Sequence, residues 1–204
     1  MTDHLEEQLV KNLTDAYSIE QQALAQLRTA PDLVEDPTLA GHLREHLTET
    51  EEQAERVRAR LEAHGGSPQK VKDLVMKLGG KGMVAFAGAQ PDTTGKLTAH
   101  AHSYEALEWA SYEMLIRMAE RAGDAETAAT ARAIRDQERA MMERLAGDFD
   151  GAVAASLREV PSDDLAQHLR HYLADAHAIE QRRRSGLTRA FLATCPWKSK
   201  RLLG

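Results

Sequence analysis

The sequence predicts an all-α protein: an antiparallel four-helix bundle with a long connection between its second and third helices, followed by an additional C-terminal fifth helix. Three observations support this class. Apolar residues recur at helical spacing over long stretches, and the helix formers Ala, Leu, Glu, Gln and Arg dominate the composition. No segment shows the sustained two-residue alternation of Val, Ile and Thr that predicts a strand. A hydrophobic fraction of 42% is enough for a core in a chain of 204 residues.

Capping and turn residues divide the chain into helices. The first helix begins at Asp3, which starts a capping-box pattern, and it ends before Pro31. Asp36 followed by Pro37 combines a capping acid with proline at the first helical position, so a second helix begins there. Gly123 is suited to end the third long helix, since glycine adopts the left-handed conformation common after helix C-termini. The expected helices are 3–28, 37–64, a shorter one at 67–79, 96–122, 124–160 and 162–193.

Two pairs of long helices flank the glycine-rich stretch 79–95. A short link makes the helices within each pair antiparallel, and a long crossing between the pairs is the arrangement of ferritin-like bundles. We therefore expect one bundle over residues 1–160, followed by a helix and a basic tail over residues 161–204.

Glutamates lie in the middle of the apolar stripes of these helices. Helical projection places Glu20, Glu108 and Glu138 near the centre of their stripes, and it places Glu49 and Glu105 at the borders. An ionised carboxylate is very costly to bury alone. Several that converge in one helical core therefore predict a shared cation, and hard oxygen donors favour iron or manganese. The alternative is that each acid pairs with an arginine or lies at a wet end of the bundle.

One histidine lies among these acids. His46 is inside the stripe of the second helix, three residues before Glu49, where it can be a metal ligand, a partner of a ligand or a satisfied core histidine. Metal sites in helical bundles usually place a histidine three residues after a glutamate. Here Glu52 and Met141 stand at that position after Glu49 and Glu138, so the usual nitrogen ligands are missing.

The fifth helix repeats part of the first. Residues 169–181 match residues 9–21 at Leu, Leu, Asp-Ala and Ile-Glu-Gln, although coincidence between alanine-rich helices explains the match as well. The repeat gives Glu180 the position of Glu20. Arg184 follows one turn later, however, so an ion pair within the helix explains this glutamate without a metal.

Composition and charge disfavour several classes of function. The net charge of −6 argues against general nucleic-acid binding, which depends on phosphate neutralisation. No apolar run approaches the roughly 20 residues that cross a bilayer, and the acidic N-terminus does not read as a secretory signal. The single cysteine, Cys195, fits a reducing compartment. We expect a cytoplasmic protein that binds neither nucleic acid nor membranes.

Four stretches resemble the YciE/YciF-type stress-response proteins of the ferritin-like superfamily. They are DAYSIEQQAL, HLTETEEQAERV, YEALEWASYEML and DQERAMMERL, one from each long helix within about residues 5–147. The resemblance implies an antiparallel four-helix bundle, usually dimeric, with a dinuclear iron site. Carried over to this chain, it points to the metal ligands Glu20, Glu49, Glu105, Glu108 and Glu138, beside which His46 is our own candidate.

Two functions from different classes follow. The first is a ferritin-like stress-response protein whose carboxylate-rich dinuclear site, with iron as the first choice and manganese or zinc as alternatives, oxidises ferrous iron with O2 or peroxide. The second is a non-enzymatic helical stress or interaction protein with a structural metal or none, which the missing histidines favour. The expected partners are metal ions, O2 or peroxide, and a second copy of the chain in a homodimer. The sequence leaves open whether the protein is an enzyme.

Overall fold

The computed structural model describes residues 2–71 and 93–159, together with single helical residues between 166 and 181. The chain divides into two compact units after Glu159. The described part of the first unit contains no strand. Its helices are α1 (Thr2–Leu27), the 3₁₀ turn η1 (Ala30–Asp32), α2 (Pro37–Ala63), α5 (Thr93–Ala122), α6 (Ala125–Gly147) and α7 (Phe149–Glu159).

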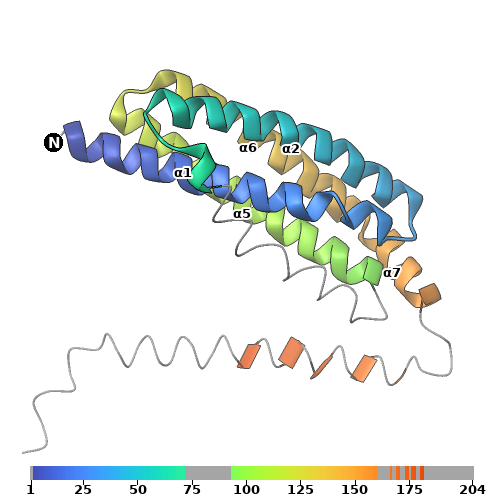
Figure 1. Cartoon of the computed structure of the whole chain (residues 1–204). Helices are drawn as coiled ribbons and strands as arrows, with labels where there is room; N and C mark the ends of the chain where they lie inside the picture. Colours follow the sequence, from blue (N-terminus) through green and yellow to red (C-terminus); the bar gives the residue numbers. More distant parts are fainter. Residues whose placement is uncertain are drawn as a thin grey trace, which may run out of the picture. The chain divides into compact units, whose positions relative to one another are not determined.

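The long helices α1, α2, α5 and α6 lie side by side as a bundle (Figure 1). Short links make α1 antiparallel to α2 and α5 antiparallel to α6. Helix α2 ends at the end of the bundle where the N-terminus lies, whereas α5 begins at the opposite end. A chain that connects them must therefore cross the length of the bundle, as in ferritin-like folds. The predicted connection itself lies outside the described residues.

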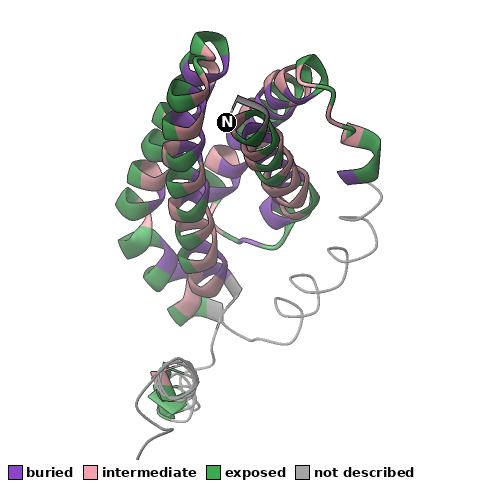
Figure 2. Ribbon diagram, turned by 90° about the vertical axis from the view of Figure 1, so that its left-hand side faces the viewer, coloured by how far each residue is buried: buried purple, intermediate pink, exposed green. Residues whose placement is uncertain are grey.

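The interior of the bundle consists of two apolar cores with a polar layer between them. One core, near the end where α5 joins α6, includes Leu13, Leu61 and Ile134. The other, near the link between α1 and α2, includes Leu43 and Leu145. Figure 2 shows the buried residues on the inner sides of the helices. The buried charged and amide side chains between the cores are Glu20, His46, Gln53, Glu105, Glu108 and Glu138.

The predicted caps at Asp36, Gly123 and Asp124 are present, whereas α1 already begins at Thr2, so that Asp3 lies inside the helix and does not cap it. The Asp36 carboxylate accepts hydrogen bonds from the backbone N–H groups of Thr38 and Leu39, at 2.9 and 3.0 Å, at the start of α2. Helix α5 ends at Gly123, whose φ of 78° is the left-handed conformation that glycine adopts most easily. The side chain of Asp124 then caps α6. These caps fix where α2 and α6 begin and where α5 ends.

The segment predicted as one helix over 124–160 is two helices. Helix α6 ends at Gly147, and Asp148 separates it from α7, which packs against α5. The Asp148 carboxylate lies 2.7 Å from His42 Nδ1 on α2. Near the same end, the Gly95 N–H donates to Ser156 Oγ at 2.8 Å, so α7 covers the beginning of α5, which starts earlier than predicted. The break is a tertiary feature, because the partners of Asp148 and Ser156 come from other helices.

Two further predictions concern segments that lie partly outside the described residues. The expected helix 67–79 is described only as far as Val71, where the chain is helical. Most of the expected fifth helix, including Arg184 beside Glu180, lies outside the described residues. None of the described helices has the length and apolarity that a membrane span requires.

Candidate metal centre

The polar layer collects acids from three helices and a histidine from the fourth. Glu20 comes from α1, Glu105 and Glu108 from successive turns of α5, Glu138 from α6 and His46 from α2. All five side chains are buried, and none is more than 3% exposed. Their helical stripes point them inward at one level of the bundle. Glu105, which projection places at a stripe border, is nevertheless buried, at 3% exposed, like the three central acids.

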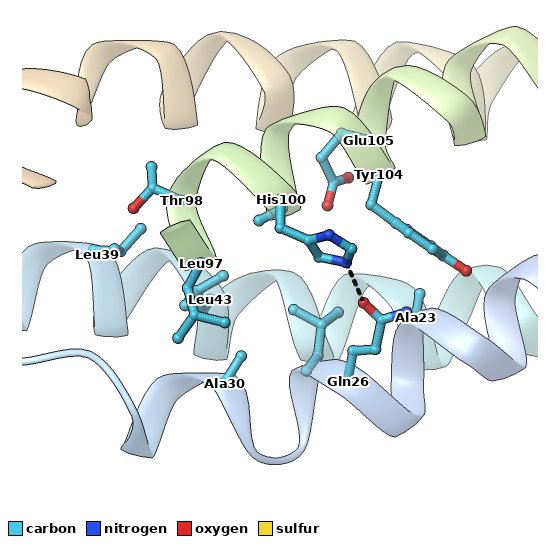
Figure 3. Close-up of a pocket in the computed structure, with 12 residues that line it drawn as sticks. Ala23, Gln26, Ala30, Leu39, Leu43, Leu97, Thr98, His100, Tyr104 and Glu105 are labelled. Atoms are coloured by element: carbon cyan, nitrogen blue, oxygen red, sulfur yellow. Dashed lines mark hydrogen bonds between the residues drawn. The ribbon is translucent and has the colours of Figure 1, made fainter. Parts of the chain in front are cut away.

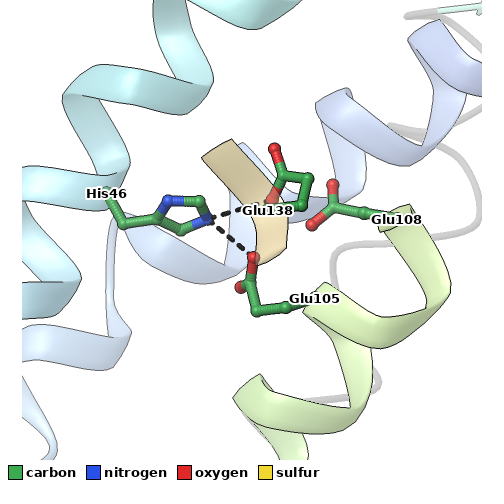
Figure 4. A group of neighbouring side chains, drawn as sticks. All are labelled: His46, Glu105, Glu108 and Glu138. Atoms are coloured by element: carbon green, nitrogen blue, oxygen red, sulfur yellow. Dashed lines mark ion pairs between the residues drawn. The ribbon is translucent and has the colours of Figure 1, made fainter. Parts of the chain in front are cut away.

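Four of these side chains converge on one point, as Figure 4 shows. One potential ligand atom from each of His46, Glu105, Glu108 and Glu138 lies within 4.8 Å of the other three. His46 Nε2 is 3.0 Å from a Glu105 oxygen and 3.8 Å from a Glu138 oxygen. A cation bound at the usual distance of about 2.0–2.2 Å from each ligand atom requires spacings of this kind.

Several ligand atoms of this group are buried without a hydrogen-bond partner. They are Glu20 Oε2, Glu108 Oε2 and both carboxylate oxygens of Glu138. His46 Nε2 and Glu105 Oε2 also lack a well-oriented hydrogen bond, but they lie 3.0 Å apart as an ion pair. Buried polar atoms are nearly always hydrogen-bonded, because an unpaired one retains its full desolvation cost. Among the described residues, no arginine or lysine forms an ion pair with these four glutamates. The donor atoms therefore fit a cation, and the arginine-pairing alternative does not account for them.

Burial raises the pKa values of Glu20, Glu108 and Glu138. The pKa of Glu20 rises to about 7 because burial disfavours the charged form, although the Tyr112 hydroxyl, which donates to Glu20 Oε1, works in the opposite direction. The pKa of Glu108 lies well above the ordinary value, first because of burial and then because of the charge of Glu138. The pKa of Glu138 is raised by burial and by Glu105. Positive charge placed among these groups would favour their ionised forms.

His46 carries the nitrogen atoms of the centre. Burial by itself would lower its pKa, but interactions with the Glu105 and Glu49 carboxylates, one at each ring nitrogen, outweigh burial and raise the pKa to about 10. In the metal-free protein the imidazole is therefore protonated and offsets part of the negative charge. A cation that binds Nε2 takes the place of a proton, as metal binding to histidine generally does.

Glu49 lies on the other side of the imidazole. Its Oε2 is 3.3 Å from His46 Nδ1, and the Arg144 guanidinium lies 3.4 Å from both carboxylate oxygens. Glu49 is 31% exposed, and its pKa is lowered, first by the hydrogen bond with His46. This position suits a residue that holds His46 with Nε2 toward the acids. Its predicted role as a direct ligand stays a prediction.

Gln53 and the tyrosines complete the polar layer. Gln53 is fully buried, and its Oε1 has no hydrogen-bond partner. It shares the inner stripe of α2 with His46, which is the signal that could have marked it as a candidate. The hydroxyl of Tyr17 is also buried without a partner, whereas the Tyr104 hydroxyl donates to the Ile19 carbonyl at 3.3 Å.

A family model described as Domain of unknown function (DUF892) matches residues 4–158. The chain belongs to this family. The DUF892 match spans α1 to α7 and so contains every residue of the candidate metal centre. A solved structure from Xanthomonas campestris is 31% identical to this chain, with a TM-score of 0.63. That alignment covers 76% of this chain and 97% of the other.

Two further solved structures show the fold. The Escherichia coli stress protein YciF is 24% identical, with a TM-score of 0.62, and the alignment covers 74% of this chain and 97% of that chain. A bacterioferritin with a diiron site from Desulfovibrio desulfuricans is 15% identical, with a TM-score of 0.53. That alignment covers 82% of this chain and 90% of the bacterioferritin chain. The DUF892 protein is therefore a ferritin-like helical bundle, and both the predicted fold class and the predicted YciE/YciF-type family are confirmed.

Proposed function

We propose that this DUF892 protein binds two divalent cations in the polar layer and oxidises ferrous iron there with O2 or hydrogen peroxide. The observation that carries the proposal is the convergence of buried ligand atoms from His46, Glu105, Glu108 and Glu138, most of whose oxygens have neither a hydrogen bond nor a cationic arginine or lysine beside them. A ferritin-like fold and the similarity to a protein described as a stress protein support a protective role of this kind.

Charge balance favours two cations over one. Glu20, Glu105, Glu108 and Glu138 carry four negative charges when ionised, which two divalent cations neutralise. The four converging residues suit the first ion, and Glu20 extends the donor set toward a second. Carboxylate oxygens with a single imidazole are donors that suit iron or manganese, whereas closed zinc sites usually take more nitrogen or sulfur.

Ferrous iron, as the substrate, supplies one electron per ion, so that two ions reduce O2 to hydrogen peroxide, or hydrogen peroxide to water, with uptake of two protons. The protein holds the ligands in place and keeps bulk water away. Glu49 orients His46, and the Tyr112 hydroxyl holds one oxygen of Glu20. The apolar cores on both sides of the layer limit solvent access.

A second candidate is a structural cation without redox chemistry. It is favoured by the donor set, because His46 is the only histidine in the group of four and no Glu-x-x-His pair is present in the described bundle. A site with so little nitrogen can hold a cation firmly without cycling between oxidation states.

Metal analysis and oxidation kinetics distinguish these functions. Protein purified without chelator is titrated anaerobically with Fe²⁺, then mixed with O2 or with hydrogen peroxide, and formation of Fe³⁺ is followed by absorbance. We expect the wild-type chain to bind two Fe²⁺ ions and to oxidise them rapidly. We expect Glu108→Gln to lose both the binding of iron and its oxidation. Glu51→Gln is the control, because Glu51 lies on the exposed face of α2. Bound metal without oxidation would favour the structural role, and absence of binding would reject the site.

The expected homodimer is part of the same proposal. Leu107 and Met114 are 51% and 64% exposed and lie two turns apart on one face of α5, where a second copy could cover them. Sedimentation of the purified chain measures its mass in solution, and a monomer at micromolar concentration would contradict the dimer. The cytoplasmic location stays a prediction.

A further inference from the structure

A small cavity of about 30 Å³ lies beside the metal centre, among α1, α2 and the first turns of α5 (Figure 3). Glu105, one of the four converging side chains, forms part of its wall. Most of the remaining wall is apolar and includes Ala23, Leu27, Leu43, Leu97 and Ala101. The cavity therefore borders the centre at Glu105, and the rest of its wall is mostly hydrocarbon, interrupted by the polar side chains of Gln26, Thr98, His100 and Tyr104.

His100 and Gln26 lie on the solvent side of this cavity. They are half-buried, whereas Leu27 and Leu97 behind them are buried. His100 Nε2 and Gln26 Oε1 are 3.2 Å apart, a hydrogen bond that joins α5 to α1 at the wall of the cavity, as Figure 3 shows. Burial lowers the pKa of His100, so the ring is neutral at neutral pH. Two uncharged, hydrogen-bonded side chains thus form the partly exposed part of the cavity wall.

The size and lining of the cavity select what can enter it. A volume of about 10–15 Å³ holds one water molecule, so this cavity accommodates a molecule of two to four atoms. A hydrated divalent cation would have to give up its water shell among hydrocarbon groups, which is very costly. A small neutral molecule has no such cost.

We propose that this cavity is the path by which a small neutral oxidant, O2 or hydrogen peroxide, reaches the Glu105 side of the centre, and that the His100–Gln26 hydrogen bond controls access. The inference rests on the proposed oxidation of ferrous iron. It separates the route of the oxidant from that of the cations, for which the partly exposed Glu49 offers a polar approach.

The first test needs no metal. Dissolved O2 is paramagnetic and speeds the relaxation of protons that it approaches, so methyl relaxation is measured in the metal-free protein with and without O2. We expect a larger effect at the Leu97 methyl groups than at those of Leu115, which is equally buried on the same helix but distant from the cavity. Equal effects at the two leucines would show that the cavity does not admit oxygen.

The second test uses one variant that fills the cavity and one that opens access to it. Ala101→Leu fills it, and we expect the bimolecular rate constant for oxidation of bound iron to fall about tenfold, which corresponds to about 1.4 kcal/mol in the barrier. His100→Ala removes the closing hydrogen bond and should raise the rate constant. Ala110→Leu, on the exposed side of α5, is the matched control. Iron stoichiometry should stay at the wild-type value in all three variants.

The outcomes distinguish the path from the function. Wild-type binding and oxidation with unchanged rate constants in both cavity variants would overturn the path and leave the proposed function standing. If the wild type binds no iron, the function fails, and methyl relaxation alone decides whether the cavity admits oxygen. Separate kinetics with O2 and with hydrogen peroxide identify which oxidant uses it. Should Ala101→Leu fail to fold, as judged by circular dichroism, His100→Ala still tests the path.

Discussion

His46 is held between carboxylates on both of its ring nitrogens. Glu105 lies 3.0 Å from Nε2 and Glu49 lies 3.3 Å from Nδ1, and Arg144 in turn holds Glu49. A partner on the outer nitrogen fixes the orientation of a ligand histidine and the nitrogen that it presents to a metal. The two carboxylates therefore have different tasks: Glu105 lies at the nitrogen that would bind a metal, and Glu49 orients the ring from the other nitrogen.

Replacing Glu49 should weaken metal binding without abolishing it. We expect Glu49→Ala to reduce the affinity for Mn²⁺ by about 10–100-fold, the usual effect of losing a partner of a ligand. Calorimetric titration measures the affinity. Glu45→Ala is the control, because Glu45 contacts the same Arg144 and does not touch His46. A loss as complete as that in Glu108→Gln would instead make Glu49 a direct ligand.

At the scale of the helices, the end of α5 depends on one glycine. Gly123 has a φ of 78°, and the Asp124 N–H that follows donates to the Ala119 carbonyl at 2.9 Å, which closes the last turn. A Cβ at Gly123 would meet no atom within 4 Å, so only the backbone conformation opposes a side chain there.

Two glycine substitutions should therefore have opposite effects. Gly123→Ala should lower the free energy of unfolding by about 1 kcal/mol, because alanine is strained at positive φ. Gly147→Ala, at a position in α6 with negative φ and open space, should raise it by up to about 1 kcal/mol. Urea unfolding of both variants measures the difference. Equal effects would contradict the assignment of Gly123 as an obligatory cap.

The same end of the bundle carries an ionic clamp between helices. His64 at the end of α2 lies 2.5 Å from Glu6 on α1 and 2.7 Å from Asp124 at the start of α6. Burial opposes the charge on His64, but the hydrogen bonds to these acids outweigh it and raise its pKa. Burial likewise opposes ionisation of Asp124, but bonds from Thr127, His64 and Arg60 lower its pKa.

The clamp should stabilise the bundle over a limited range of pH. The raised pKa of His64 gives a contribution that is full below the ordinary value of 6.5 and is lost as pH rises through the folded pKa. The lowered pKa of Asp124 gives a contribution that is full above the ordinary value of 3.8 and is lost as pH falls below it. The stability difference between wild type and His64→Gln should therefore be largest between these values and shrink at alkaline pH. His4→Gln, at an exposed site, should show no such pH dependence.

At the scale of the whole molecule, the polar layer interrupts an otherwise apolar interior. The two cores stabilise the bundle, since each fully buried leucine contributes about 1.5–3 kcal/mol. The acids between them are desolvated, and several of their oxygens have no hydrogen-bond partner. Metal binding should therefore act on the stability of the entire bundle and not only on local structure.

Thermal unfolding tests this coupling. Mn²⁺ at 100 times its dissociation constant should stabilise the wild type by about 2.7 kcal/mol, because it binds only the folded chain. Metal-free Glu138→Gln should be as stable as the wild type or more so, since a neutral amide is less costly to bury, and should gain nothing from metal. Glu51→Gln should respond to metal as the wild type does. A metal-dependent gain in Glu138→Gln would show that Glu138 is not a ligand.

Much of the fold and part of the site follow from local patterns. The start of α2 at Asp36 and the end of α5 at Gly123 were predictable because capping depends on a few neighbouring residues. The burial of Glu20, Glu108 and Glu138 was predictable because a helix repeats every 3.6 residues, so that spacing along the chain determines which face a side chain occupies.

Sequence alone therefore determined the helices, their caps and the inward direction of the central acids. Only the tertiary structure decided that Glu105 is buried, that Glu49 pairs with Arg144, that the chain breaks at Asp148, and that a cavity borders the centre. These features depend on how each helix is rotated and which neighbour it meets. Contacts between helices bring together residues that are far apart in the chain, and helical periodicity carries no information about such partners.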